Sequence, residues 1–146
     1  MATTDTHEVV QTRLRHNDQR YTTRRRQLVD ILIADGGPMT IPQILEAAPA
    51  LAQSSIYRNL GVLEDAGVVV RIVTSDDFAH YELTEELTEH HHHLICADCG
   101  DVADFSLRES VETELDRALH AAARKAGFDI RHHRLDLVGQ CAGCRS

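Results

Sequence analysis

The chain has 146 residues, a formal net charge of −8 and a hydrophobic content of 42%, with three Phe, three Tyr and no Trp. This length suffices for one ordinary domain or two small ones. The sequence contains no run of about 18 apolar residues, which excludes a transmembrane helix, and its polar residues 1–20 lack the apolar centre of a signal peptide. We therefore expect a cytoplasmic protein with reduced thiols and no membrane partner.

The charge is distributed unevenly along the chain. Residues 1–70 hold seven Arg and eight acidic residues, a net charge of −1, whereas residues 71–146 hold eight Lys and Arg and fifteen acidic residues, a net charge of −7. The whole-chain charge argues against non-specific binding to nucleic acid, although a local basic face can still bind phosphates. The acidic excess accompanies the histidines and cysteines, as expected for a part of the chain that binds cations.

The first elements are predicted to be helical. A polar extension, residues 1–20, precedes an amphipathic helix over residues 21–34, which Gly36 ends. Thr40, with Gln43 three residues later, forms a capping box that opens a second helix.

A third helix and a hairpin follow. Ser54 is expected to be the N-cap of this helix, and Gly67 is expected to end it in the left-handed conformation. β-Branched and alternating residues predict strands over residues 68–73 and 79–83, joined by a turn at residues 75–77. Three helices followed by a hairpin are the order of a winged helix-turn-helix domain, which we place at residues 1–83.

Exposed polar residues of this domain are candidates for DNA contacts. Tyr57 and Arg58 lie on the third helix, where Arg can bind guanine and Tyr can contact a phosphate or a thymine methyl group. An exposed Tyr-Arg pair is also common without any function. Arg24, Arg25 and Arg26 are either phosphate contacts or a solvated helix face.

The second part, residues 90–146, is predicted to be a small α/β domain. Short strands are expected at residues 94–96 and 102–105, and a final strand at residues 128–138. Ser106 and Glu109 match another capping box, which would open a long helix that ends near residue 126. The apolar residues of this helix are expected to face inward: Val111, Leu115, Ala118, Leu119 and Ala122.

All four cysteines lie in two Cys-x-x-Cys motifs, Cys96 with Cys99 and Cys141 with Cys144. This spacing lets two sulfur atoms of one tight turn bind a single tetrahedral Zn²⁺, and two such turns fill its coordination shell. A closed shell indicates a structural site. The alternatives are disulfides or the redox chemistry of one motif, both less common in a reducing compartment.

Four consecutive histidines precede the first of these motifs. Side chains of a strand alternate between its faces, so His91 and His93 would point to one side and His90 and His92 to the other. The pattern therefore predicts two pairs of ligands for two metal sites. Imidazole binds Zn, Fe, Ni, Co and Cu alike, so the pattern does not identify the metal. A surface histidine cluster without function is the alternative.

Taken together, these motifs resemble the ferric uptake regulator (Fur) family of bacterial metal-dependent repressors. The resemblance extends from about residue 21 to residue 144 and depends on four segments of the sequence: SSIYRNLGVLEDAGVV, HYEL, HHHHLICADCG and HHRLDLVGQCAGC. It implies an α+β fold, a homodimer on a pseudo-palindromic DNA operator, and a hinge at residues 84–89 where bound metal sets the angle between the DNA-binding domains.

The resemblance also implies a role for each group of candidate residues. Structural zinc would be held by Cys96, Cys99, Cys141 and Cys144. A regulatory divalent metal at the hinge, Zn²⁺ or Fe²⁺ with Mn²⁺ and Ni²⁺ as further options, would be held by Glu82, His91, His93 and Asp104. An additional metal would be held by His90, His92, Glu112 and His133. Contacts to DNA would come from Ser54, Ser55, Tyr57, Arg58, Arg24 and Arg25.

The chain departs from the family pattern in ways that bear on the metal. Many members carry a histidine at the start of the second helix, where this chain has Pro38, Met39 and Thr40, so His80 is a candidate replacement ligand. Residues 81–89 lack the further cysteine that many zinc sensors carry. This absence weakens the interpretation of the chain as a zinc sensor but does not exclude it. Asp104 stands where peroxide-sensing relatives carry Asp.

The expected function is a metal-dependent repressor of genes for metal uptake or homeostasis. A peroxide-sensing repressor of the same family is the first alternative. A metal storage or delivery protein is an alternative of another class, and it would bind metal without any change in DNA affinity. An enzyme is not expected, because no nucleophile or acid–base group accompanies the histidine cluster.

Overall fold

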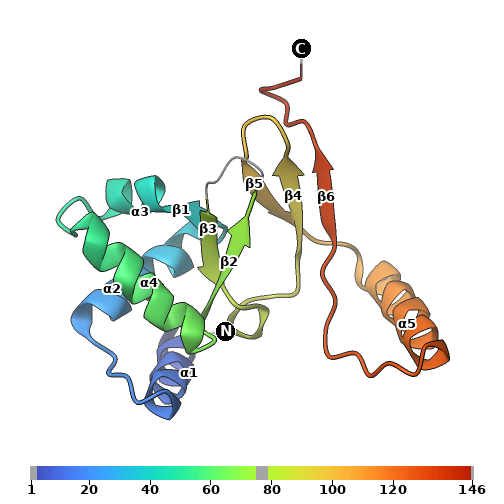
Figure 1. Ribbon diagram of the computed structural model, residues 1–146, viewed down its shortest axis with the longest axis horizontal. Coiled ribbons are helices and arrows are strands. Elements are labelled where there is room, and N and C mark those ends of the chain that lie inside the picture. Colours follow the sequence, from blue (N-terminus) through green and yellow to red (C-terminus); the bar gives the residue numbers. More distant parts are fainter. Residues whose placement is uncertain (1–2, 75–78, 146) are drawn as a thin grey trace.

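The computed structural model describes residues 3–74 and 79–145, and it confirms the α+β class (Figure 1). The N-terminal part consists of α1 (Thr3–His16), α2 (Thr23–Asp35), β1 (Met39–Thr40), α3 (Ile41–Ala47), α4 (Gln53–Asp65), β2 (Val69–Val73) and β3 (Ala79–Leu83). The C-terminal part consists of β4 (His92–Cys96), β5 (Val102–Phe105), α5 (Glu109–Lys125) and β6 (Asp136–Gly139). Residues 84–89, called the linker below, join the two parts and contain the short 3₁₀ helix η1 (Glu85–Leu87).

The sheet of the N-terminal part has the order β1-β3-β2, and all of its strands are antiparallel. The strand β1 was not expected from the sequence, and the expected turn at residues 75–77 lies outside the described residues. Along β3, Tyr81 and Leu83 belong to the hydrophobic core. Because side chains of a strand alternate, His80 and Glu82 point away from that core. Glu82 is thereby directed toward the C-terminal part, whose histidines it contacts.

Local capping explains where the first helices begin and end. Thr22 caps α2, and Gly36 ends that helix with a φ of 78°. The predicted capping box of Thr40 and Gln43 is present at α3. The prediction for α4 is wrong: this helix begins at Gln53 after Ala52, without a side-chain cap, so Ser54 lies inside its first turn and cannot be the N-cap.

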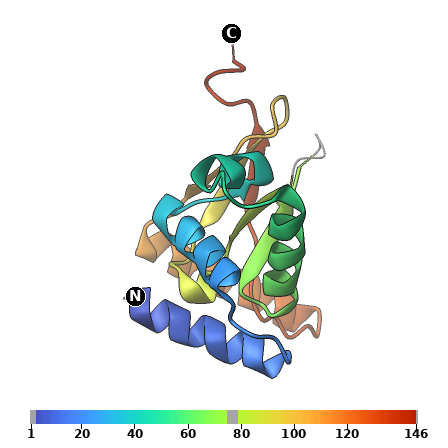
Figure 2. The ribbon, with the colours of Figure 1, turned by 90° about the vertical axis from the view of Figure 1, so that its left-hand side faces the viewer.

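The polar extension at residues 1–20 contains a helix that the sequence analysis did not predict, because residues 3–16 form α1. Its side chains Val10 and Leu14 are fully buried in the core formed with α2, α3 and α4. His7 is buried as well, and its ring lies 2.5 Å from the Tyr21 hydroxyl and 2.7 Å from Asp30 Oδ1. Figure 2 shows α1, in dark blue, lying across the base of this helical layer. A few buried positions on a polar helix give too weak a period to be recognised in the sequence.

Replacing Leu14 by alanine is expected to destabilise the N-terminal part by about 2–5 kcal/mol, because it removes a fully buried side chain and leaves a cavity. Urea unfolding followed by circular dichroism measures this change. Gln11→Ala, on the exposed side of the same helix, is the matched control and is expected to change stability by less than about 0.5 kcal/mol. Equal midpoints for the two variants would show that α1 does not contribute to the core.

The sheet of the C-terminal part has the order β5-β4-β6, with β4 and β5 antiparallel and β4 and β6 parallel. The prediction of a strand over residues 128–138 is wrong in extent. The strand β6 covers only Asp136–Gly139, which pairs with residues 93–96 of β4, and residues 128–135 are irregular. The short β4 gives the returning chain few positions with which to pair.

The helix α5 stands apart from the rest of the chain (Figure 1). It begins at Glu109 after Arg108, without a side-chain cap, so the predicted capping box of Ser106 and Glu109 is wrong. None of its residues is buried, contrary to the inward face predicted for Val111, Leu115, Ala118, Leu119 and Ala122. Phe128 and Val138 are also exposed, by 67% and 69%. Among the described residues of one chain, these apolar side chains are exposed or only half-buried.

No described helix is long and apolar enough to cross a membrane.

Candidate metal centres and DNA-binding surface

The two Cys-x-x-Cys turns lie against each other at one end of the C-terminal sheet. One sulfur atom from each of Cys96, Cys99, Cys141 and Cys144 lies within 4.8 Å of all the others, and all four are free thiols. The backbone N–H of Cys141 donates to Cys96 Sγ at 3.3 Å. Backbone hydrogen bonds from Cys99 and Cys141 lower the pKa of Cys96 to about 6, whereas the neighbouring thiols raise the pKa of Cys144 to about 12. Four such thiols favour a bound cation, and their donor set suits Zn²⁺.

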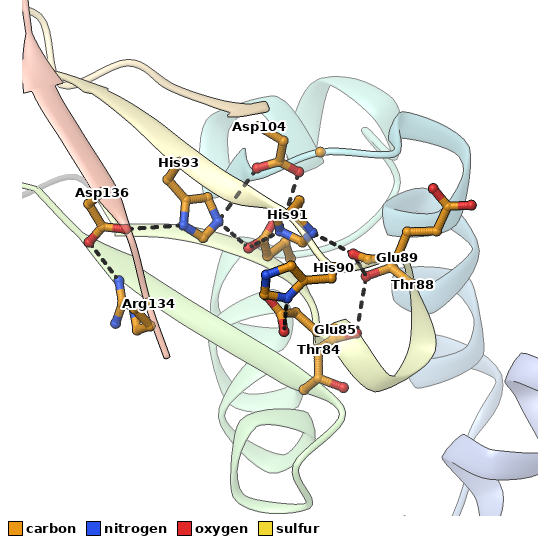
Figure 3. Close-up of polar contacts among 12 residues, drawn as sticks. Thr84, Glu85, Thr88, Glu89, His90, His91, His93, Asp104, Arg134 and Asp136 are labelled. Carbon is orange, nitrogen blue, oxygen red and sulfur yellow. Dashed lines mark hydrogen bonds and ion pairs between the residues drawn. The ribbon is translucent and has the colours of Figure 1, made fainter. Parts of the chain in front are cut away.

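A second cluster lies between the two parts of the chain. This interdomain cluster consists of Glu82 from β3, His91 just before β4, His93 from β4 and Asp104 from β5. Glu82 Oε1 lies 2.6 Å from His93 Nε2 and 3.1 Å from His91 Nε2. Asp104 lies 3.5 Å from His93 Nε2 and 3.6 Å from His91 Nε2 (Figure 3). Both imidazole rings therefore turn the same nitrogen atom toward the carboxylates.

Outer partners fix the orientation of these two rings. The Nδ1–H of His91 donates to the carbonyl oxygen of Glu89 at 2.8 Å. On the other ring, His93 Nδ1 lies 3.4 Å from Asp136, whose carboxylate also accepts from Arg134 (Figure 3). Such outer partners direct the second nitrogen of each ring toward a metal. Asp104 Oδ1 is buried and has no hydrogen-bond partner, so the cluster retains a donor atom for a cation. The donor set fits a divalent metal.

Protons occupy this cluster in competition with a metal. Burial and the charge of Glu82 raise the pKa of Asp104 to about 6. The hydrogen bond to Glu82 raises the pKa of His93, and although burial opposes it, hydrogen bonding to Glu89 and Glu82 raises the pKa of His91. Burial acts to raise the pKa of Glu82, but the two histidines outweigh it and the net pKa is lowered. Glu82 thus stays ionised in the range where the other three groups take up protons.

We expect the affinity of the interdomain cluster for Mn²⁺ to fall as the pH falls, first through the raised pKa values of His91 and His93 and then through about 6, the pKa of Asp104. Each proton that Mn²⁺ must displace weakens binding by roughly tenfold per pH unit below the pKa of its group. Competition with a chelator between about pH 8 and pH 5.5 measures the slope. Asp104→Asn is the control, because the amide takes up no proton in this range and the slope near pH 6 should become shallower. An affinity that does not change with pH would contradict this view of the cluster.

The third cluster, called the α5 cluster, lies on the opposite face of the histidine segment. It consists of His90, His92, His133 and Glu112 of α5, with one ligand atom of each within 4.8 Å of the others. Glu112 contacts His92 Nε2 and lies 3.2 Å from His90 Nε2 and 3.8 Å from His133 Nε2. His92 Nδ1 and His133 Nε2 are buried without a hydrogen-bond partner. Three imidazoles and a carboxylate with unpartnered nitrogens fit a divalent transition metal.

The structure thus brings together each of the three predicted sets of residues and keeps the two histidine pairs apart. It does not bring His80 into the interdomain cluster. That side chain is buried on β3, and its Nδ1 has no hydrogen-bond partner. Sequence patterns gave no signal for the outer partners Glu89 and Asp136. Glu89 contacts His91 through its backbone carbonyl oxygen, and Asp136 reaches His93 only because β6 pairs with β4.

Three of the DNA candidates, all arginines, lie together on the helical layer. Arg24, Arg25 and Arg58 line a common recess with Thr22, Thr23 and Asn59. Arg25 is held in place by Asn59 Oδ1 at 3.0 Å, Gln19 Oε1 at 3.2 Å and the Arg20 carbonyl oxygen at 2.7 Å. Ser54 and Arg58 are exposed, and Tyr57 is 54% exposed. Ser55 is buried and accepts hydrogen bonds from Asn59, so its side chain faces the interior.

Sequence comparison decides the family. The profile of the ferric uptake regulator family matches residues 16–138. The chain belongs to this family. It is therefore a metal-responsive transcriptional regulator, and Fur-family proteins bind operator DNA as dimers and are not enzymes.

Individual Fur-family relatives show how far the similarity extends. The chain is 30% identical over 138 residues to the peroxide-responsive repressor PerR of Staphylococcus saprophyticus, which covers 92% of this chain and 88% of that protein. The fold matches the ferric uptake regulator Fur of Helicobacter pylori with a TM-score of 0.77 at 21% identity, over 100% of this chain and 95% of that chain. The fold also matches the Campylobacter jejuni peroxide stress regulator with a TM-score of 0.62 at 25% identity, over 82% of this chain and 87% of that chain.

Proposed function

We propose that this protein is a metal-dependent repressor of genes for metal uptake or homeostasis, with Zn²⁺ or Fe²⁺ as its co-repressor. The observation that carries the proposal is the interdomain cluster, in which Glu82 of the winged sheet contacts His91 and His93 of the C-terminal part. A metal ion bound at the interdomain cluster would join the two parts of the chain and set the position of α4 relative to the C-terminal part.

A divalent cation at the interdomain cluster would supply bonds that join Glu82 to the histidines and Asp104. Without it, two carboxylates share the cluster with two histidines, and their contacts depend on bound protons. Burial of Glu82 and Asp104 makes their mutual repulsion costly when both are ionised. The metal-bound arrangement is thereby favoured over an open one, and the two copies of α4 in a dimer acquire the spacing of operator half-sites.

The other two clusters receive supporting roles in this proposal. The cysteine cluster ties β4 and its turn to the C-terminal segment after β6, and structural zinc there would hold the C-terminal part together. The α5 cluster would hold an additional metal between the histidine segment and α5. Tyr57, Arg58, Arg24 and Arg25 would contact the operator, and the buried Ser55 is the one proposed contact whose side chain the structure directs inward.

Fluorescence-anisotropy titration of labelled promoter DNA tests the proposal. The full-length protein with its cysteine zinc is titrated anaerobically with buffered Zn²⁺, Fe²⁺, Mn²⁺ and Ni²⁺ in turn, at one salt concentration, because phosphate contacts make affinity salt-dependent. We expect one metal to increase DNA affinity by roughly 5- to 150-fold. Tight metal binding with unchanged affinity for all candidate operators would instead indicate a storage or delivery protein.

Peroxide sensing is a second candidate function. Its support is the composition of the interdomain cluster, two histidines and two carboxylates without a thiol, which suits Fe²⁺, together with the similarity to peroxide-responsive repressors. Hydrogen peroxide should then release operator DNA from the Fe²⁺-loaded protein and leave the Mn²⁺-loaded protein bound. Equal retention of DNA by both forms would exclude this function.

A further inference from the structure

The linker is attached to the N-terminal part by one of its own side chains. Leu87, at the end of η1, is buried in the hydrophobic core of the N-terminal part. Two backbone hydrogen bonds close the η1 turn. The Leu87 N–H donates to the Thr84 carbonyl oxygen at 2.9 Å, and the Thr88 N–H donates to the Glu85 carbonyl oxygen at 3.1 Å. The backbone of Glu85 and Glu86 is therefore held in position with the winged helix.

From this turn, Glu85 contacts a ligand of the α5 cluster. Its Oε2 accepts from His90 Nδ1 at 3.0 Å (Figure 3). The other nitrogen of this ring, His90 Nε2, lies 3.2 Å from Glu112 Oε2. A carboxylate that accepts the Nδ1 proton leaves Nε2 as the nitrogen that faces the cluster. Glu85 also lines the same recess as His90, Glu112 and His133. The contact therefore crosses from the N-terminal part to the α5 cluster.

The neighbouring residue links the same turn to α4. Arg13 of α1 contacts both Glu86 and the carbonyl oxygen of Gly67, the second residue after the end of α4. A second contact also joins the end of α1 to the end of α4: Asn17 Nδ2 donates to the Asp65 carbonyl oxygen at 3.1 Å. One turn of the linker thus has a contact with the α5 cluster on one side and, through Arg13, with the end of α4 on the other.

We propose that Glu85 is a positioning residue that couples metal binding at the α5 cluster to the position of the linker. The proposal extends the proposed function, because it assumes that the α5 cluster binds a divalent cation. Glu85 orients His90 for that cation, and by linkage the bound cation stabilises the linker turn by the same factor. The interdomain cluster and the α5 cluster then act on the same linker from its two faces.

Co²⁺ binding to the α5 cluster tests this coupling. The background is the full chain with its cysteine zinc and with His91→Gln and His93→Gln, so that added Co²⁺ goes to the α5 cluster. Chelator competition gives the Co²⁺ dissociation constant, and hydrogen exchange gives the protection of residues 84–89. We expect Glu85→Ala to weaken Co²⁺ binding by about tenfold or more, as typical for an outer carboxylate partner, and to abolish the protection that Co²⁺ confers on the linker.

Two further variants make the result specific. Glu85→Gln retains an oxygen that accepts from His90 Nδ1, and it should recover part of the Co²⁺ affinity. Asp116→Asn removes a negative charge from the same recess but contacts His120 and not His90, so both readouts should stay at the background value. Unchanged Co²⁺ affinity and linker protection in Glu85→Ala would overturn the proposal. An equal loss in Asp116→Asn would overturn it as well, because it would indicate a general electrostatic attraction of the recess for Co²⁺ and no specific role of Glu85. These readouts need no DNA, so a failure of metal-dependent repression is recognised separately.

Discussion

Replacement of Cys141 by serine is expected to remove the zinc and unfold the C-terminal part. The four sulfur atoms lie within 4.8 Å of one another, and serine lacks the thiolate that completes the set. Structural Zn²⁺ sites contribute about 10–16 kcal/mol of apparent binding free energy at pH 7, which is comparable to the whole stability of a domain of about 5–15 kcal/mol. The C-terminal part depends on the site because α5 buries no side chain within the chain.

Metal content by mass spectrometry, thermal unfolding by circular dichroism and size by sedimentation measure this outcome. Ala142→Ser is the matched control, since it adds a hydroxyl group to the same exposed turn and leaves all four thiols in place. It should keep one zinc per chain and the parental transition. A Cys141→Ser protein that remains dimeric, with the same unfolding transition, would show that the cysteine cluster has no structural role.

The second large effect is expected at the interdomain cluster. His91→Gln combined with His93→Gln should leave a folded, zinc-containing protein whose DNA affinity no longer responds to metal. The amide groups can still donate hydrogen bonds to Glu82, so its buried carboxylate keeps partners, but an amide is a much weaker metal ligand than imidazole. The metal-dependent gain in affinity, typically about 5- to 150-fold, is the quantity that should disappear.

Anisotropy titration with and without metal measures this loss. His120→Gln removes an exposed histidine of α5 that belongs to none of the three clusters, and it should respond to metal like the parent protein. If the double variant keeps its metal response, the regulatory role belongs to His90, His92, His133 and Glu112 instead. Loss of the response in both variants would point to a general effect of histidine content.

The predictable part of the fold is the part that local patterns determine. The boundaries of α2 and α3 follow from Gly36 and from the capping box at Thr40, and both signals are contained in a few consecutive residues. The division of the histidines between two clusters follows from the alternation of side chains along a strand. The cysteine cluster follows from the reach of a Cys-x-x-Cys turn. In each case the signal comes from residues that are close together in the sequence.

The features that sequence analysis missed depend on tertiary contacts. The burial of α1 depends on Val10 and Leu14, which become significant only beside α2 and α4. The strand β6 is short because β4, its partner, is short. The contact of Glu85 with His90 depends on the linker turn, whose position is fixed by the buried Leu87. Apart from His90, none of these residues belongs to a motif, so no spacing rule could identify them.

The exposed helix α5 has a consequence for the amount of protein in the cell. Its apolar side chains, like those of Phe128 and Val138, are left for a second copy of the chain to cover. The stability of the C-terminal part should then rise with protein concentration, whereas the core of the N-terminal part, complete within one chain, should melt at the same temperature at every dilution. By mass action, the copy number of the regulator would determine how much of it can occupy both halves of an operator.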